Sequence, residues 1–321
     1  MKNPPNSFKV ALLIQGPLKS IGRSGKTSSV DLHKIQSSDV IAYDCRKLIS
    51  ELVNKYGYLF EQIILSTWND EILEFEENSI EIYKFNKDKV PKGDKSRAWI
   101  NNPYVSKNNT FYQYYGCIFG LKKIRNDINH VVKIRTDQFI NLEKIFNFMQ
   151  KNYEKDTVLV PKISLTKGPV FEDFYFAGSK KIINKFLDSI ISKDKEGILL
   201  YSDSPHINPL LKFAFAESKK TIFFEEKYYK KFGYGSLEQY VILFYIFNKY
   251  FRPFPFEIAK NMKWRGSKFG LNNIWIKDQN DKLNFDFKQY YKKDIWSTHK
   301  KFKPRLKNFL KNILSLIKNV F

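Results

Sequence analysis

The first indication of the fold comes from the stretch Val131-Val-Lys-Ile-Arg-Thr-Asp137, a short apolar run that ends in polar residues. A run of this length is typical of a strand that is covered on both faces. In open α/β sheets, ligand sites gather just beyond the carboxyl ends of such strands. We therefore expect Val131–Ile134 to be a central strand, and Arg135–Asp137 to lie at a ligand site.

Short apolar runs alternate with longer amphipathic segments on both sides of this stretch. The alternation favours an α/β fold, a mixed sheet flanked by crossover helices. We expect further strands at residues 8–14, 62–65, 80–85, 157–161, 171–176 and 221–224. We expect helices at residues 39–55, 109–125, 142–153, 180–192 and 237–250, and a long loop at 87–107. Since no internal repeat or low-complexity linker interrupts the chain, residues 1–300 are interpreted as one domain.

The last residues predict a separate element, a basic amphipathic helix at residues 301–321. Pro304 suits a helix start, and beyond it apolar residues occupy one helical face while lysine, arginine and asparagine occupy the other. No acidic residue follows Asp294. Two interpretations stay open. The helix docks on the body or in a dimer interface, or its residues 304–321 attach to the anionic inner face of the cytoplasmic membrane.

Composition and charge exclude some classes of protein. Hydrophobic residues make up 43% of the 321 residues and aromatic residues 17%, which argues against disorder. The net charge of +22 points to nucleic-acid binding as one interpretation, but only eight of the 55 basic residues are arginine. Base and phosphate recognition favours arginine, whereas scattered lysine is typical of solvated surfaces. We therefore expect no nucleic-acid partner.

Targeting signals and cysteine usage both point to the cytoplasm. The apolar run at residues 10–14 is too short for a signal peptide, and no stretch approaches the roughly 20 apolar residues of a membrane span. Cys45 and Cys117 are far apart in the sequence. One disulfide between them stays open, but reduced thiols in the cytosol are the simpler interpretation.

Polar residues follow several of the expected strands, where a ligand site would form. Gln15-Gly16-Pro17 follows the first strand; the glycine would let a planar base approach the backbone closely, although an ordinary tight turn would look the same. At the central strand, Arg135 would neutralise a phosphate, and Asp137 is placed to hold a divalent cation, Mg²⁺ or Mn²⁺. A second interpretation of Asp137 is a carboxylate that caps a turn.

Three further residues are candidates for chemistry later in the chain. Asp173 lies within an aromatic run, where a carboxylate is unusual unless it has a role or an arginine partner. Glu238 opens a helix, where it would act as a base or only favour the helix dipole. His299 would supply a late metal ligand, although an isolated surface histidine is the simpler interpretation.

Five segments together resemble one family, the WavE family of lipopolysaccharide-synthesis proteins. Their order and spacing carry the resemblance, which spans about residues 8 to 180. The segments are Ile14-Gln15-Gly16-Pro17, Leu65-Ser66-Thr67-Trp68, Asn108-Asn109 with Gln113 and Gly120-Leu121, Lys133-Ile134-Arg135-Thr136-Asp137, and Asp173 to Gly178.

The resemblance implies a glycosyltransferase of GT-A-like fold that acts in lipopolysaccharide, lipooligosaccharide or capsule assembly. It implies a nucleotide-sugar donor and a glycan or glycolipid acceptor. Asp173 would be the first choice of catalytic base and Glu238 the second, while Asp137 would be the metal- or ribose-binding aspartate. His299 stays a candidate metal ligand from the sequence alone. The donor would be bound by Gln15, Gly16, Pro17, Thr67, Asn109, Gln113, Arg135 and Asp137.

This sequence departs from the family pattern at two positions. Arg135 stands where the first aspartate of a GT-A DxD motif is expected, which leaves the dependence on a cation open. Tyr112 stands where the family often has arginine, which would alter the choice of donor.

Three different functions compete with this one. The first is a P-loop kinase, because residues 20–27 approximate the phosphate-binding motif GxxxxGK[ST], with Ser20 in place of the first glycine. A true phosphate loop follows its strand directly, whereas Pro17 intervenes here. The second is a protein that binds polyanions without catalysis. The third is a nucleotide-dependent transferase of a polyol phosphate or a sugar phosphate.

Overall fold

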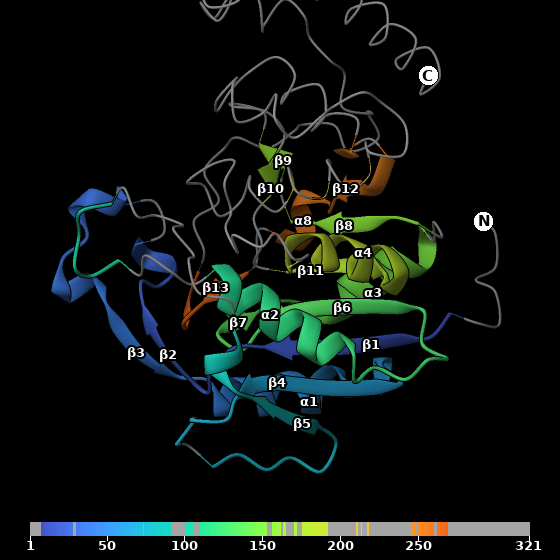
Figure 1. Cartoon of the computed structure of the whole chain (residues 1–321), viewed down its shortest axis with the longest axis horizontal. Coiled ribbons are helices and arrows are strands. Elements are labelled where there is room, and N and C mark those ends of the chain that lie inside the picture. Colours follow the sequence, from blue (N-terminus) through green and yellow to red (C-terminus); the bar gives the residue numbers. More distant parts are fainter. Residues whose placement is uncertain are drawn as a thin grey trace, which may run out of the picture.

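The computed structural model gives the protein a central sheet with helices on both sides (Figure 1). It describes residues 8–27, 30–72, 74–90, 100–105, 110–152, 156–161, 163–164, 170–171, 175–191, 210, 213, 217, 246–247, 249–259 and 262–268. The predicted tail helix at residues 301–321 lies outside them, as do the predicted strand at 221–224 and most of the predicted helix at 237–250. In the described part, no helix has the length and apolarity needed to span a membrane.

The main sheet has seven described strands in the spatial order β12-β8-β11-β6-β1-β4-β5. All of them run in one direction except β11, which is antiparallel to both of its neighbours. The inner strand β1, which lies between β6 and β4, is buried along its whole length, as a strand between two helical layers must be. The strands are β1 Val10–Gln15, β4 Gln62–Trp68, β5 Glu81–Phe85, β6 His130–Arg135, β8 Val158–Val160, β11 Phe176–Ser179 and β12 Phe251–Pro253.

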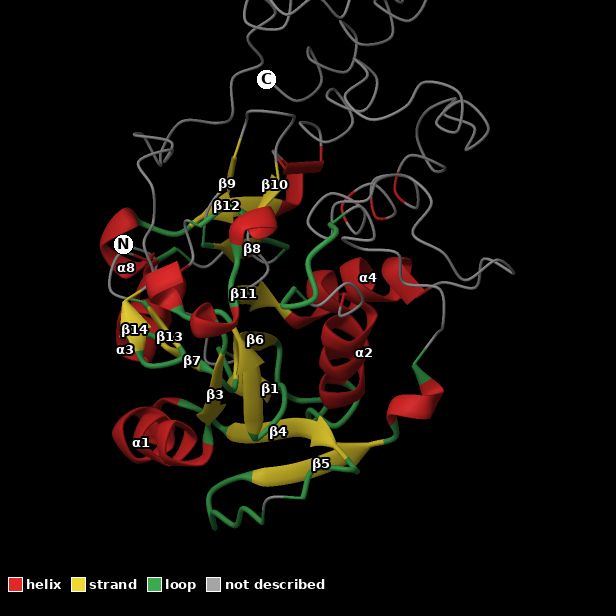
Figure 2. Cartoon of the chain, turned by 90° about the vertical axis from the view of Figure 1, so that its left-hand side faces the viewer, coloured by secondary structure: helices red, strands yellow, loops and turns green. Residues whose placement is uncertain are grey.

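Helices cover both faces of this sheet, as the edge-on view shows (Figure 2). One layer contains α1 (Arg46–Tyr56) and α3 (Leu142–Lys151), the other α2 (Thr110–Leu121) and α4 (Lys180–Ile191). Alternate residues of β1 enter the two cores: Leu12 and Ile14 pack with α1 and α3, while Leu13 packs with α2 and α4. The α/β mixed sheet flanked by helices, expected from the sequence, is confirmed.

Smaller sheets lie at the carboxyl ends of the central strands and beyond them. β2 (Lys19–Gly22) pairs with β3 (Ile41–Asp44), and β7 (Gln138–Phe139) pairs with β13 (Lys263–Trp264). β13 also pairs with β14 (Ser267–Lys268), and β9 (Ile163–Ser164) with β10 (Val170–Phe171). The other elements are α8 (Phe256–Ala259) and the 3₁₀ turns η1 (Gly25–Thr27), η2 (Leu32–Lys34), η3 (Ser37–Asp39), η4 (Gly57–Leu59) and η5 (Lys87–Lys89).

Two element boundaries differ from the sequence-based expectation. The helix expected at residues 39–55 begins only at Arg46, because Ile41–Asp44 pairs with β2 as a strand. The strand expected at 171–176 is divided between β10 and β11. In both places the pairing of distant segments overrides a local pattern.

The segment that resembles a phosphate-binding loop has a different structure. Ser20 lies in β2, which is antiparallel to β3 and outside the main sheet, and Gly25–Thr27 forms a 3₁₀ turn. The Gly25 backbone is packed against the backbone oxygens of Ser267 and Lys268. This is not the strand–loop–helix arrangement that a phosphate loop needs.

Candidate functional site

The candidate site lies where the order of the main sheet reverses. From β1 the chain moves outward through β4 to β5 and then returns to β6, on the other side of β1. Gln15 at the end of β1 is in register with Ser66 of β4 and Arg135 of β6. The carboxyl ends of parallel strands at such a reversal are where open α/β sheets bind ligands.

The Gly16 backbone, which follows β1, lies close to the side chain of Thr136, which follows β6. Gly16 has φ +139°, and a Cβ atom there would lie 2.6 Å from Thr136 Oγ1. Two backbone hydrogen bonds hold these residues in place. Gly16 N donates to Ser66 O of β4, and Thr136 N donates to Gln15 O of β1, both at 3.1 Å. Glycine is therefore required here by sterics as well as by backbone conformation.

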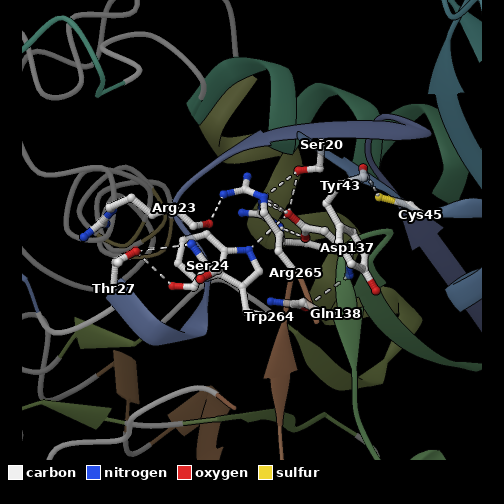
Figure 3. Close-up of polar contacts among 11 residues, drawn as sticks. Ser20, Arg23, Ser24, Thr27, Tyr43, Cys45, Asp137, Gln138, Trp264 and Arg265 are labelled. Carbon is white, nitrogen blue, oxygen red and sulfur yellow. Dashed lines mark hydrogen bonds and ion pairs between the residues drawn. The ribbon is translucent and has the colours of Figure 1, made fainter. Parts of the chain in front are cut away.

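Asp137 is the centre of the site, and its carboxylate is surrounded by hydrogen-bond donors (Figure 3). Arg135 Nε donates to Oδ1 at 3.0 Å, and Arg135 Nη2 donates to Oδ2 at 2.9 Å. Oδ2 also accepts from Ser20 Oγ at 2.7 Å and from Trp264 Nε1 at 3.0 Å. Arg265 Nε lies 3.1 Å from the same oxygen. Residues from β2, β6 and β13 thus converge on one carboxylate.

The electrostatics of the site follow from burial and from these charges. The side chain of Asp137 is 1% exposed, that of Arg265 7% and that of Arg135 19%. Burial by itself would raise the pKa of Asp137, but the guanidinium groups of Arg135 and Arg265 hold this pKa well below its usual range. Burial lowers the pKa of Arg265 to about 10, against the opposing effect of Asp137. All three groups are therefore charged at neutral pH.

A tight turn between β13 and β14 delivers Arg265 to the site. Arg265 has φ +46° and is followed by Gly266 with φ +75°; two consecutive positive φ values are typical of a two-residue hairpin turn of type I′. Among the described residues, Arg265 is the one non-glycine residue with a positive φ. Its backbone N–H donates to Asp137 O at 2.8 Å, and its side chain reaches Ser20 Oγ and the carbonyl of Arg23.

An aromatic ring supports both guanidinium groups. The Trp264 ring centroid lies 5.9 Å from Arg135 Cζ and 4.8 Å from Arg265 Cζ. Cations within about 6 Å of an indole are attracted to it. Trp264 therefore stabilises the two positive charges while its Nε1 hydrogen-bonds to the negative one.

The residues around Asp137 do not fit a divalent cation. Both carboxylate oxygens already accept hydrogen bonds, and a cation beside them would meet two guanidinium groups. At an effective dielectric constant of about 20, one unit charge about 4 Å from a guanidinium is repelled by about 4 kcal/mol, and a divalent ion by about twice that. Within the described ranges, no cluster of three His, Cys, Asp or Glu residues could hold a metal. His299 lies outside those ranges.

The structure brings some of the predicted donor-binding residues together. Gln15, Gly16, Arg135 and Asp137 meet at the ends of β1 and β6, as expected. Pro17 follows Gly16 and is partly exposed. Asn109, Asp173 and Glu238 lie outside the described residues, so their roles stay predictions.

The two remaining predicted residues belong to β4 and α2. Thr67 is fully buried, and none of the residues that the structure describes hydrogen-bonds to its Oγ1. Gln113 is partly buried on α2, one turn before Gly116, which packs against the side chain of Gln15. Helix α2 therefore lies against the end of β1, and Gln113 precedes that contact along the helix.

The sequence did not single out Ser20, Trp264 and Arg265 as one group. The signal that was present is the scarcity of arginine in a lysine-rich chain, combined with an Arg-Gly pair at residues 265–266. Cys45 and Cys117 are both buried thiols, and they do not form a disulfide with each other. Burial, and to a smaller extent the negative charge of Asp137, raises the pKa of the Cys45 thiol to about 12.

Comparisons with known proteins give limited similarity. No family model matches the chain, and no curated protein matches it. Among solved structures, 4-diphosphocytidyl-2C-methyl-D-erythritol synthase from Anaerococcus prevotii is 14% identical, with a TM-score of 0.35, over 66% of this chain and 84% of that one. Galactosyltransferase LgtC, solved with donor and acceptor sugar analogues, is 8% identical with a TM-score of 0.34, over 70% and 82%. Mouse xyloside xylosyltransferase 1 is 8% identical with a TM-score of 0.31, over 68% and 84%.

Proposed function

We propose that this chain is a glycosyltransferase that transfers a sugar from a nucleotide-sugar donor to a growing bacterial surface glycan. The observation that carries the proposal is the cluster of Arg135, Asp137 and Arg265 at the reversal point of the sheet. Two guanidinium groups against one carboxylate leave a positive site, which suits the phosphates of a nucleotide. Gln15 and Gly16 at the end of β1 lie beside it, but the side of Gly16 where a Cβ would be is filled by Thr136 Oγ1, so this glycine is explained by packing and not by approach of a flat base.

The reaction needs charge stabilisation and proton removal. An acceptor hydroxyl oxygen forms a bond to the anomeric carbon, while the bond from that carbon to the donor phosphate breaks and its electron pair leaves with the phosphate. The positive site stabilises the charge that develops on the phosphate oxygens. A carboxylate accepts the hydroxyl proton in an inverting reaction, and Asp173 or Glu238 is proposed for that role.

The finer parts of the proposal come from the sequence resemblance. They are the WavE family and lipopolysaccharide, lipooligosaccharide or capsule as the product. Attachment of residues 304–321 to the cytoplasmic face of the inner membrane is proposed from the amphipathic basic pattern of those residues. A transferase of polyol phosphate or sugar phosphate would use the same nucleotide site, and analysis of the product for transferred phosphorus separates the two.

A thermal-shift panel tests the proposal directly. UDP-, GDP-, CMP- and dTDP-sugars are each added to the full-length protein, with EDTA and with Mn²⁺. A ligand at about 100 times its Kd stabilises the native state by about 2.7 kcal/mol, so at least one donor should raise the Tm. If no donor raises the Tm under either condition, the proposal is refuted.

The proposed base is tested by conservative substitution. Asp173→Asn should abolish transfer to the acceptor while the Tm shift by the donor is retained, because only the proton acceptor is lost. Glu238→Gln is the second variant. Full activity in both variants would exclude these bases and would favour a front-face retaining mechanism that uses no protein base.

A further inference from the structure

The charges at the site conflict with the usual, cation-mediated way of binding a nucleoside diphosphate. In that arrangement, carboxylates hold a divalent cation, and the cation holds the phosphates. Here Asp137 is fully committed to protein donors, and a guanidinium lies on each side of it. The position where a cation would sit next to this carboxylate is thus occupied by protein cations.

We infer that Arg135 and Arg265, oriented by Asp137, bind the donor phosphates without a divalent cation. The inference rests on the proposed function and concerns how that same site recognises its ligand. Arg135 is the group placed to contact the phosphate, because its side chain is the more exposed of the two. Arg265 acts through its charge and through its contact with Asp137.

Counting charges explains why two arginines are needed. Arg135 alone would form a neutral pair with Asp137 and would have little attraction for an anion. Arg265 adds a second positive charge beside the same carboxylate, at 3.1 Å, and restores a net positive charge. In a buried setting that charge is screened less than on the surface.

The backbone at Arg265 supports a functional role for this side chain. An L-residue in the left-handed region costs about 1–2 kcal/mol, and a type I′ turn would be easier to form with asparagine or glycine. The arginine is nevertheless held there by Ser20, Asp137 and the carbonyl of Arg23. Strain of this kind clusters at functional sites.

A buried donor that no described residue satisfies lies beside the cluster. Gln138 is fully buried, its Oε1 accepts from Arg135 N at 3.2 Å, and its Nε2 has no hydrogen-bond partner within the described part of the chain. An unpaired buried N–H group is costly, and a ligand oxygen would satisfy it. This observation is independent of the guanidinium pair, and it also indicates that an acceptor-rich group such as a phosphate binds at the end of β6.

The test measures nucleotide binding with and without divalent cations. UDP, GDP, CDP and dTDP are each titrated into the full-length protein by calorimetry, first in EDTA and then in MnCl₂ or MgCl₂. At least one of these nucleotides should bind in EDTA with a Kd within about threefold of its value with the cation. Binding that weakens about tenfold or more in EDTA would overturn the inference but leave the proposed function standing. Absence of binding by all four nucleotides under every condition would overturn both.

Two substitutions and a control locate the effect. Arg265→Gln leaves Arg135 and Asp137 as a neutral pair, so the Kd measured in EDTA should rise by about tenfold or more. Asp137→Asn removes the charge that orients both guanidinium groups, so the Kd should rise by a similar factor in EDTA and in MnCl₂, whereas loss of a metal ligand would weaken binding only in MnCl₂. Arg125→Gln is the control, because this exposed guanidinium precedes β6 at the opposite end of the strand.

The outcomes stay informative if a variant is unstable. The comparison of EDTA with MnCl₂ uses the unmodified protein and needs no variant. Circular dichroism selects a temperature at which each variant is folded. An Arg265→Gln protein that is folded and binds the nucleotide as tightly as the unmodified protein would overturn the role given to Arg265.

Discussion

Arginine is the scarce cation of this chain, and two of its eight arginines meet at one carboxylate. Lysine, which supplies the remaining basic residues, has a flexible point charge, whereas the planar guanidinium makes two directed hydrogen bonds to a carboxylate or phosphate. Arg135 could be predicted as a site residue because it ends an apolar run. Arg265 could not be predicted, because no local sequence pattern connects it to Asp137, which lies 128 positions earlier in the chain.

Replacement of Asp137 tests the organising role of this residue. Asp137→Asn keeps the size of the side chain but removes the charge that orients both guanidinium groups. Turnover should fall by about 100-fold or more, since charge stabilisation depends on fixed geometry. The buried Arg265 and the partly buried Arg135 would also lose their counter-charge, which should cost about 3–5 kcal/mol of stability. Initial rates and denaturant unfolding measure the two effects.

The control for this variant is Asp127→Asn. Asp127 pairs with Lys9 at 2.7 Å and is about half exposed, so its replacement should leave the stability nearly unchanged. Unaltered turnover in a folded Asp137→Asn protein would contradict the assignment of Asp137 to the site.

A buried histidine predicts how stability depends on pH. Burial lowers the pKa of His130 to about 4 in the folded chain, against an ordinary value of 6.5. Between these two values the unfolded chain binds a proton that the folded chain does not, so stability falls as the pH drops from about 6.5 toward 4. The loss should be roughly 2–3 kcal/mol, which urea unfolding at a series of pH values measures.

His130→Gln isolates this effect because glutamine does not titrate. The variant should show little change in stability between pH 6.5 and pH 4.5. The buried, paired Asp137 titrates below this window, because its pKa is held well below the usual range. An equally steep pH dependence in the variant would assign the effect to other groups.

At the scale of elements, the small sheets show where sequence patterns lose their predictive power. The apolar runs of β1, β4 and β6 are long enough to identify strands, and all three are present. β13 and β14 have two residues each, and such short segments carry no periodicity. They are stabilised by pairing with β7 and by contact with Asp137, which are both distant in the sequence.

Trp264 links the β13–β14 hairpin to the site, and its replacement tests that link. Trp264→Phe keeps an aromatic ring but loses the Nε1 hydrogen bond to Asp137 Oδ2. The free energy of unfolding should fall by about 1.5–3 kcal/mol, the usual value for a hydrogen bond to a charged group. Turnover should fall as well, because the turn that carries Arg265 loses one of its attachments.

A double-mutant cycle separates the hydrogen bond from packing. In the Asp137→Asn background, Trp264→Phe should cost less than in the unmodified protein, since the charged acceptor is already gone. Equal costs in the two backgrounds would mean that the indole contributes through packing alone.

At the scale of the whole molecule, the class of fold could be predicted and the order of the strands could not. Alternating strand and helix patterns are local and indicate an α/β sheet. The return of the chain from β5 to β6, beside β1, is a property of the complete chain. That return places Gly16 against Thr136 and creates the site, so the site residues could be proposed from strand ends before their neighbours were known.

The last prediction concerns residues 304–321, which lie outside the described residues and whose helix stays a prediction. Their pattern is apolar on one face and basic on the other, without an acidic residue. Each basic residue near an anionic leaflet contributes about 1 kcal/mol to binding, and the apolar face adds the burial of its side chains. The full-length protein should therefore sediment with vesicles that contain phosphatidylglycerol but not with vesicles of phosphatidylcholine alone. A chain that ends at Lys303 should stay in the supernatant with both kinds of vesicle, while its Tm shift by the donor is unchanged. If the shortened chain partitions as the full-length protein does, the tail is not a membrane anchor, and docking on the body or in a dimer interface becomes the explanation for its amphipathic pattern.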